Sequence, residues 1–421
     1  MRGELIGSRH ARCGAGWTTI ALGEAGTWLS GGTPSTGNDA FWGGEIPWIS
    51  GASMKNFRIV DSDRRVTELG ARQGSRLVEQ GAVLFVVRGM SLKSEFRVGV
   101  TQRRVAFGQD CKAIVPGDGI DATYLALAIQ ARTAHILTLV EETSHGTGRL
   151  DTARLQQLRI PLPPLREQQR IVAAYAAFER RIGALERVQL KTQVTERSWS
   201  MTGLTEAWKT ETVLLGECLA ELSTGWSPVC EPRQPGADEW GVLKLSAVTS
   251  GRFVADEAKA LPSAVGARPA LEIRPGDVLM ARANGVKDLV GVACVVREVR
   301  RKLMLPDLMF RLTADSAVLQ PEFLGLVLTS SEVRRQINDA MRGSSGQHKI
   351  SQRDVRDLLI PRVALREQHR VIAGKREFER RLNALAGQVA KLRTIQLAVV
   401  EDLLADRVEL LPPERAYASL G

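Results

Sequence analysis

The chain has 421 residues, which is enough for two or three domains, and its 44% hydrophobic and 25% charged residues are typical of a folded globular protein. An excess of 57 Lys and Arg over 47 Asp and Glu gives a net charge of +10, which is compatible with a polyanionic partner but does not identify one. The longest nearly apolar run, Leu289–Val296, is far shorter than the about twenty residues of a spanning helix, and the first residues lack the apolar core of a signal peptide. We therefore predict a cytoplasmic protein without a membrane partner.

The predicted elements follow one another in the same order in two halves of the chain. After an N-terminal extension (1–16), the first α/β domain (17–160) has predicted strands at Ala82–Val87 and Val98–Val100 and a helix at Tyr124–Val140. A helix (161–200) and a linker (201–212) follow. The second α/β domain (213–360) has predicted strands at Val278–Met280 and Leu289–Val296 and a helix at Pro321–Met341; a helix (361–405) and a C-terminal tail (406–421) complete the chain.

The two long helices have clear start signals and a coiled-coil pattern. Pro163, Pro164 and Pro361 precede them, and Glu167 and Glu367 lie in their first turns, where the helix dipole favours an acid. Apolar residues then recur at alternating spacings of three and four, which predicts a helix–helix seam. The predicted seam residues are Ile171, Tyr175, Phe178, Ile182 and Leu185 in the first helix and Phe378, Leu382, Leu385, Val389, Leu392, Val399 and Leu403 in the second. Gln396 interrupts the second pattern, and the first shifts to Val188 and Val194, which favours an earlier end or a bend.

An internal repeat is the strongest signal in the sequence. Residues 160–185 and 360–385 are identical at 14 of 26 positions without a gap, including Leu-Arg-Glu-Gln at 165–168 and 365–368. Weaker similarity extends upstream, where Gly81-Ala-Val-Leu corresponds to Gly276-Asp-Val-Leu. The chain is therefore a tandem duplication of one domain-plus-helix unit.

These patterns predict an α+β fold with two α/β domains in tandem, each followed by a long α-helix. The two helices can bury their seams against each other, most simply as an antiparallel coiled coil with pseudo-two-fold symmetry. The alternative is that each helix packs only on its own domain.

The patterns of common catalytic and metal sites are absent from the sequence. The five Cys are widely spaced without a C-x-x-C pair, which indicates reduced and mostly buried thiols, and the five His form no H-E-x-x-H motif. There is no G-x-x-x-x-G-K-[ST] phosphate loop, no amino-methyltransferase tetrapeptide and no carboxylate cluster of a metal-dependent nuclease. We expect neither a catalytic residue nor a metal or other cofactor on this chain.

The sequence resembles the specificity subunits of Type I restriction–modification systems over about residues 17–405. The resemblance is carried by Gly31–Ser35 followed by Ile46–Ile49, by the Gly-x-Val-Leu strands and above all by the two I-P-x-x-x-L-R-E-Q elements, 200 residues apart. It implies two target recognition domains that each read one half of a split site in double-stranded DNA, spaced by the helices. It further implies docking of two methyltransferase subunits and of motor-nuclease subunits, which carry S-adenosylmethionine, ATP and Mg²⁺.

Candidate DNA-binding residues are cations and polar residues in the predicted loops and strand ends, because such side chains reach base edges and phosphates. The alternative for any single cation is an ordinary solvated surface charge, and the Gly-rich loops have plain loops as their alternative. The candidates in the first domain are Arg64, Arg65, Arg88, Lys93, Arg97, Arg103, Arg104, Ser144, Gly146, Thr147, Gly148 and Arg149. Those in the second are Arg282, Asn284, Lys287, Arg300, Arg301, Lys302, Ser344 and Lys349. We interpret Trp42, Trp48, Trp226 and Trp240 as anchors of the core or of loops.

Two other functions compete with the specificity subunit. A self-sufficient restriction or modification enzyme requires nuclease or methyltransferase motifs, which the sequence lacks. A coiled-coil scaffold without a DNA role does not require two elaborate domains of divergent sequence. Net charge does not decide between them, because +7 of the excess falls on the helical segments 165–200 and 361–405, while the two α/β domains are nearly neutral.

Overall fold

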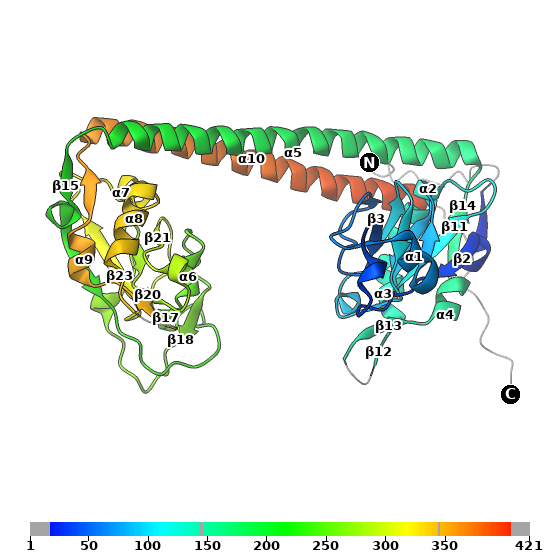
Figure 1. The fold of residues 1–421 in the computed structure, drawn as a ribbon, viewed down its shortest axis with the longest axis horizontal. Coiled ribbons are helices and arrows are strands. Elements are labelled where there is room, and N and C mark those ends of the chain that lie inside the picture. Colours follow the sequence, from blue (N-terminus) through cyan, green and yellow to red (C-terminus); the bar gives the residue numbers. More distant parts are fainter. Residues whose placement is uncertain (1–16, 144–145, 344–345, 406–421) are drawn as a thin grey trace, which may run out of the picture. The chain divides into compact units, whose positions relative to one another are not determined.

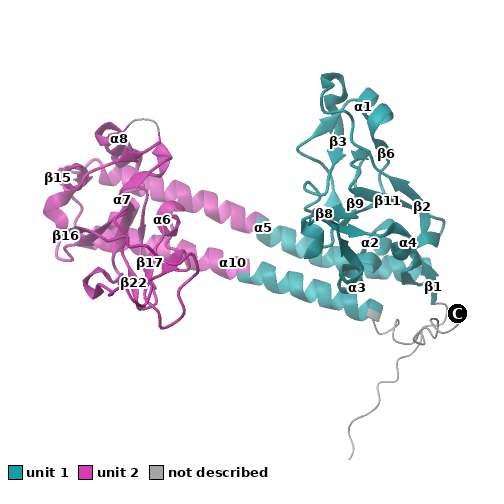
Figure 2. Cartoon of the chain, turned by 90° about the horizontal axis from the view of Figure 1, so that it is seen from below, with its two compact units in different colours: residues 1–186, 387–421 teal, residues 187–386 magenta. Residues whose placement is uncertain are grey.

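The computed structural model describes residues 17–143, 146–343 and 346–405. The N-terminal extension (1–16), the tail (406–421), Ser144 and Ser344 lie outside the described residues. The chain divides into two compact units, shown in different colours in Figure 2: unit 1 comprises residues 1–186 and 387–421, and unit 2 comprises residues 187–386. No helix in the described part is both long enough and apolar enough to cross a membrane.

Unit 1 is built on a five-stranded sheet in the order β2-β11-β7-β9-β4. These strands are β2 (Gly26–Ser30), β11 (Cys111–Pro116), β7 (Val83–Val86), β9 (Val98–Thr101) and β4 (Arg58–Ile59). All neighbours pair antiparallel except β4, which is parallel to β9. The central strand β7 reads VLFV with every residue buried, as expected of a strand covered on both faces. Helix α2 (Ala122–Gln130), whose residues Tyr124 to Ile129 are all buried, covers one face.

A second sheet covers the opposite face of the first. Its order is β5-β3-β10-β6, with strands β5 (Arg65–Val66), β3 (Trp42–Ile49), β10 (Val105–Phe107) and β6 (Arg76–Val78). Helix α1 (Glu68–Gly74) packs on this sheet. The ends of the β-rich part of unit 1 meet in the antiparallel pair of β1 (Thr18–Ala21) and β14 (Arg159–Leu162). The chain therefore leaves this β-rich part beside its start and enters the long helix α5 (Leu165–Ala207) (Figure 1).

Unit 2 repeats this plan. Its main sheet has the order β16-β23-β19-β21, with strands β16 (Leu219–Thr224), β23 (Met309–Ala314), β19 (Val278–Ala281) and β21 (Ala293–Val295). A three-stranded sheet has the order β18-β17-β22, with strands β18 (Ala258–Ala260), β17 (Gly241–Leu243) and β22 (Leu303–Met304). The pair β15 (Thr212–Leu214) and β25 (Leu359–Pro361) corresponds to β1 and β14 and leads into α10 (Leu365–Ala405). Among the described residues, unit 2 has no strand that corresponds to β4.

Three predicted elements are shorter or divided in the structure. The predicted helix 124–140 is two helices, α2 and α3 (Thr133–Thr138), and the predicted helix 321–341 is α7 (Pro321–Val327) and α8 (Ser331–Ala340). The division in unit 2 has a local cause, because the side chain of Ser330 accepts a hydrogen bond from the Val333 N–H and caps a new helix. The apolar run 289–296 contributes only the three-residue strand β21.

In unit 1, the beginning of α5 packs antiparallel against the end of α10. Ile171, Tyr175 and Ile182 of the predicted seam are buried. Toward the end of α10, the buried residues are Val400 and Leu404, which join the main core of the unit, whereas the predicted Leu403 is 38% exposed. Farther along the two helices, Glu186 Oε1 and Arg393 Nη2 form a surface ion pair at 2.6 Å, in agreement with the antiparallel arrangement.

Polar residues continue the seam where its apolar pattern is interrupted. Gln396 is only 7% exposed, and its Nε2 donates to Glu179 Oε1 at 2.8 Å and to the Tyr175 carbonyl at 3.4 Å. In the second half of α5, the hydroxyl of Thr192 donates to the Val188 carbonyl and that of Ser200 to Glu196 Oε1. These buried hydroxyls are thus satisfied within α5. The helix continues to Ala207, so residues 201–207, which the sequence assigns to a linker, are helical.

In unit 2, the end of α5 packs antiparallel against the beginning of α10. The rings of Trp199 and Phe378 lie 5.8 Å apart. Gly374 makes room for this contact, since a Cβ atom there would lie 2.5 Å from the indole ring of Trp199. The fold class is therefore confirmed in its two β-rich units and in the packing of the two long helices against each other.

The glutamine of each Leu-Arg-Glu-Gln element joins a long helix to its own β-rich unit. In unit 1, Gln168 is 1% exposed; its Oε1 accepts the Asp121 N–H at 2.8 Å, and its Nε2 donates to the carbonyls of Gly119 and Pro163 at 3.0 and 2.9 Å. In unit 2, Gln368 is equally buried; its Oε1 accepts the Gln320 N–H at 2.8 Å, and its Nε2 donates to the carbonyls of Val318 and Val363 at 2.8 and 2.7 Å. Each amide thus uses its acceptor and both donors on backbone groups of the loop before α2 or α7 and of the turn before the helix.

The thiols are consistent with a structural role. Cys111 and Cys294 are free and buried, and burial raises the pKa of both thiols to about 12, so they remain protonated at neutral pH. Cys218 and Cys230 are free and half-buried. Cys13 lies outside the described residues.

Replacing Gln168 or Gln368 with Leu is expected to destabilise the protein by about 2–4 kcal/mol, because one N–H and two carbonyl groups lose their partner in a buried place. Urea unfolding followed by circular dichroism measures the loss. The neighbouring Gln169→Leu exchange is the matched control, because Gln169 is exposed. Equal effects at 168 and 169 would contradict the role of the buried amide.

Candidate nucleic-acid interface

Equivalent short hairpins bring the predicted loop residues together in each unit. In unit 1, β13 (Gly148–Leu150) lies between β12 (Val140–Glu142) and β8 (Arg88–Gly89), with Arg149 opposite Arg88. In unit 2, β24 (His348–Lys349) pairs with β20 (Ala283–Asn284), with Lys349 opposite Ala283 and His348 opposite Asn284. Figure 1 shows β12 and β13 on the side of unit 1 away from its helical segments.

Glycines permit the tight turns of these hairpins. In unit 1, the Thr143 N–H donates to the Thr147 carbonyl, and the Gly146 N–H donates to the Thr143 carbonyl, with φ of 76° at Gly146. In unit 2, Gly343 has φ of 136°, and a Cβ atom there would lie 2.1 Å from the Gln347 carbonyl oxygen. Both turns therefore need a residue without a side chain.

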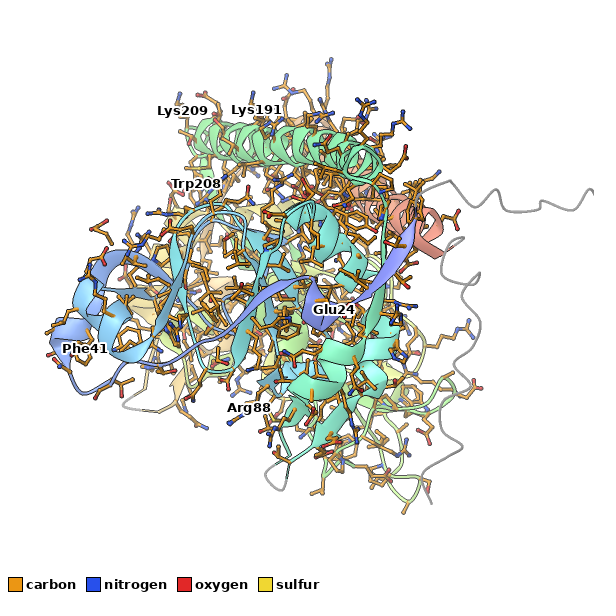
Figure 3. All side chains as sticks on the ribbon, turned by 90° about the vertical axis from the view of Figure 1, so that its right-hand side faces the viewer. Glu24, Phe41, Arg88, Lys191, Trp208 and Lys209 are labelled. Atoms are coloured by element: carbon orange, nitrogen blue, oxygen red, sulfur yellow. The ribbon has the colours of Figure 1, made fainter. Side chains whose placement is uncertain are left out.

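The cations on and near the hairpin of unit 1 differ in how far their side chains are free to bind another molecule. Arg149 is exposed and forms no ion pair with the described residues. Arg88, labelled in Figure 3, is 49% exposed and lies 3.6 Å from Asp110, a distance that makes a weak surface pair. Lys93 Nζ lies 2.6 Å from Glu142 Oε1. Arg97 is held most firmly: it pairs with Glu95, donates to the Gly51 carbonyl at 2.8 Å and is only 22% exposed.

The hairpin of unit 2 presents a different set of groups. Lys287 and Lys349 are exposed and form no ion pair within the described part of the chain. The Oδ1 of Asn284 accepts the Val286 N–H at 2.9 Å, which leaves its NH₂ group for another acceptor. Arg282 is partly engaged, because it donates to the Asp307 carbonyl at 3.2 Å and lies over the Phe310 ring.

The remaining candidates of unit 1 lie on the second sheet rather than on the hairpin. Arg64 stacks on Trp42 and Trp48, 4.0 and 4.9 Å from the ring centroids. Arg65 pairs with Asp61 through two hydrogen bonds, whereas Arg103 is exposed. Arg104 pairs with Glu68 and Glu79, and the hydrogen bond from Arg104 lowers the pKa of Glu68 below its ordinary value. Trp42, Asp63, Arg64 and Arg65 line an open hollow of about 350 Å³.

The remaining candidates of unit 2 lie in the loop before β22. Arg300 donates to the carbonyls of Ala237 and Glu239, and Lys302 Nζ donates to the Asp238 carbonyl at 2.7 Å. Lys302 also adopts φ of 66°, so this loop is fixed by backbone contacts. Arg301 alone of the three is exposed.

The hairpins contain further exposed groups that the sequence did not single out. Met90, 67% exposed, approaches the Thr147 hydroxyl with its sulfur at 3.9 Å. Arg342 forms a backbone bridge with Lys349, and its side chain reaches Asp354 at 3.3 Å. The position of Arg342 next to a Gly-rich loop could have identified it from the sequence. Met90 could not be found in this way, because the sequence does not show that the strand after the first Gly-rich loop pairs with β8.

Comparison with known proteins agrees with this architecture. Residues 15–196 match the family described as the Type I restriction modification DNA specificity domain. The chain is 33% identical over 193 residues to the Type I restriction enzyme EcoEI specificity subunit of Escherichia coli, a match that covers 45% of this chain and 32% of that protein. It is also 33% identical over 165 residues to the EcoR124I/EcoR124II specificity subunit of E. coli, covering 39% of this chain and 40% of that protein. The matched region thus spans less than half the length of either relative.

A solved structure extends the likeness of the fold over nearly the whole chain. It is titled as the structural basis of complex assembly and conformational transition of the type I R-M system and has 18% sequence identity and a TM-score of 0.58. The likeness covers 94% of this chain and 99% of that one.

The duplicated α+β units with paired long helices define a tandem protein that presents two related but different polar surfaces. Within the chain, residues 15–196 form a region similar to the Type I restriction modification DNA specificity domain, and the relatives that share this sequence similarity are specificity subunits of Type I restriction enzymes.

The structure predicts that Arg97 and Arg149 differ in their effect on stability. Arg97→Met removes the hydrogen bond to the Gly51 carbonyl and the contact with Glu95, and is expected to lower the free energy of unfolding by about 1–2 kcal/mol. Arg149→Met is expected to change it by no more than about 0.5 kcal/mol, because the Arg149 side chain is exposed. Thermal unfolding of both variants tests this, and a loss of stability only in the Arg149 variant would contradict the assignment.

Proposed function

We propose that this chain is the DNA sequence-specificity subunit of a Type I restriction–modification complex. Its two units are target recognition domains that read the two halves of an asymmetric, bipartite site in double-stranded DNA. The long helices hold the two domains in register and dock two methyltransferase subunits. Motor-nuclease subunits join the same complex.

The duplicated hairpin is the observation that carries this proposal. The two copies share the backbone plan but differ in the side chains they present: Arg88 and Arg149 in unit 1 take the places of Ala283 and Lys349 in unit 2. A two-stranded β-ribbon fits the major groove of DNA, and Arg, Lys and Asn side chains are among those that distinguish bases there. Two such readers with different side chains support a target whose half-sites differ.

The surface of α5 supports the docking of partner subunits. Leu190, Val194 and Met201 lie on the part of α5 that belongs to unit 2 and are 62%, 63% and 60% exposed. Their spacings of four and seven residues put them on one face of the helix. A row of exposed large apolar side chains is a typical protein-binding surface. We assign this row to a methyltransferase subunit.

Catalytic cofactors belong to the partner subunits in this proposal. S-adenosylmethionine serves methyl transfer on the methyltransferase subunits, and ATP and Mg²⁺ serve the motor-nuclease subunits. In the parts of the chain that the structure describes, no group of three or more His, Cys, Asp or Glu side chains could hold a metal ion.

Methylation mapping tests the proposal directly. A host strain that expresses this chain with the methyltransferase subunit of its own system is sequenced by a single-molecule method that detects methylated bases. The expected result is one split, asymmetric motif that disappears when the gene for this chain is deleted. A motif that persists after the deletion would overturn the proposal.

Arg149→Ala and Lys349→Ala are expected to affect one half-site each. Loss of a base contact costs about 1–3 kcal/mol, so methylation at the affected half-site should weaken or lose sequence selectivity while the other half-site is unchanged. Methylated motifs of each variant give the readout. Lys191→Ala is the control, because Lys191 is an exposed cation that points outward from α5 (Figure 3). Identical changes in both half-sites for both variants would contradict separate reading.

Lengthening both helices together is expected to lengthen the unread gap of the motif. One heptad inserted after Leu185 and another after Arg393 preserves the seam, because Glu186 faces Arg393 and both residues then stay on the same side of the two inserts. Seven helical residues add about 10 Å, which corresponds to about three base pairs of DNA. An unchanged gap in a variant that still methylates would show that the helices do not set the spacing.

A further inference from the structure

The two copies of the domain differ at one edge of their main sheets. In unit 1, β4 covers the outer edge of β9: the N–H groups of Val100 and Gln102 donate to the carbonyls of Phe57 and Ile59 at 2.8 and 2.9 Å. The side chain of Phe57 then lies on the long helix, with its ring 5.1 Å from that of Tyr175. One extended segment thus fills the space between sheet and helix.

The corresponding edge of unit 2 is open in the described part of the chain. The backbone bonds from Gly81 to Thr101 and from Gly276 to Val296 show that residues of β9 and β21 correspond at an offset of 195. Val295 and Arg297 therefore take the places of Val100 and Gln102. Because Cys294 and Val296 point their backbone groups toward β19, the N–H groups of Val295 and Arg297 point to the open edge, where the described residues supply no acceptor.

The chain segment that forms β4 in unit 1 is used differently in unit 2. After β17, the chain forms the short helix α6 (Ser246–Thr249) and folds back, with the Val254 N–H donating to the Ala247 carbonyl. Phe253 packs into the core of the three-stranded sheet. The unit therefore does not cover this edge of β21 with its own segment.

A pocket of about 1000 Å³ lies beside the open edge, between β21, the start of α7 and α10. Its α10 wall includes Ile372 and Ala373, which correspond to Val172 and Ala173 of unit 1, and Val172 and Phe57 both pack against the main core of unit 1. Unit 1 places an apolar side chain, Phe57, between its sheet and its long helix, whereas the described residues of unit 2 leave a pocket between β21 and α10.

The charges in this pocket neutralise one another. Arg297 pairs with Glu379 and lies 3.6 Å from Glu322, and Arg376 donates to both oxygens of Glu322 at 2.9 and 2.8 Å. Arg380 at the rim pairs with Glu377 at 2.6 Å. An anionic ligand such as a nucleic acid strand would have to break these pairs, whereas an extended polypeptide needs only the free N–H groups and the apolar wall.

We propose that the open edge of β21 and the adjoining pocket bind an extended segment of a partner polypeptide. The segment adds parallel to β21, as β4 adds to β9 in unit 1, and it places a large apolar side chain on Ile372 and Ala373 of α10. Main-chain hydrogen bonds supply the attachment, and the pocket selects the side chain. This site adds a protein-binding function to unit 2 that is independent of DNA reading.

A photo-crosslinking experiment on the full chain tests the site with a defined probe. The probe is a synthetic peptide with the sequence of residues 54–61, in which benzoylphenylalanine replaces Phe57. After irradiation, mass spectrometry is expected to locate the adduct within residues 293–298 or on α10 between His369 and Asn383. An adduct confined to unit 1, or spread over the surface, would overturn the proposal.

A blocking variant and its control give the second readout. Ala373→Trp fills the pocket from an exposed helix position and is expected to lower peptide labelling about tenfold or more. Ala384→Trp makes the same change at an exposed position of α10 outside the pocket lining and should label as the unmodified chain does. Thermal unfolding verifies that both variants fold, and equal labelling of the two variants would refute the site. The test uses no DNA and no methyltransferase, so its outcome is separate from that of the methylation mapping.

Discussion

One buried amide in each unit determines how a long helix leaves the β-rich part. Gln168 and Gln368 each bond a backbone N–H and two carbonyls, and these backbone groups belong to segments about fifty and five residues away in the chain. A buried amide whose oxygen and both N–H groups are bonded to backbone groups admits few alternative geometries, because each lost bond leaves a buried backbone group without its partner. The two glutamines therefore set the orientation in which α5 and α10 start, and with it the faces of the two helices that form the seam.

The framework of the fold was accessible from the sequence because it is repeated and periodic. The 26-residue repeat predicted both helix starts, and apolar spacing predicted seam residues such as Ile171, Ile182 and Leu385, which are buried. The extent of α5 was not accessible, because Thr192 and Ser200 are polar and read as surface residues. Gln396 likewise interrupts the apolar spacing of α10 in the sequence, although in the structure it is buried and bonded to Glu179. A polar residue can be buried in a seam when it has a hydrogen-bond partner, and the partner of Gln396 lies 217 residues away in the sequence.

The candidate interface was accessible only in part. Composition and Gly content pointed to the loops that end at Arg149 and Lys349, and the structure places both on hairpins of the same design. Composition could not separate these residues from Arg97, Arg104 or Arg300, whose guanidinium groups are held by carboxylates or backbone carbonyls. The residue type alone does not show whether an Arg or Lys side chain is free at the surface or bonded within the fold, because this depends on the groups that the fold places beside it.

The division of each long helix between the two units has a consequence for biosynthesis. The main core of unit 1 includes Val400 and Leu404, which are among the last described residues of the chain, whereas unit 2 is one continuous segment, residues 187–386. On the ribosome, domains commonly fold in the order of their synthesis. Here the order of completion is reversed: the segment translated first retains an unfilled core until the end of α10 emerges, so the second unit can finish folding before the first.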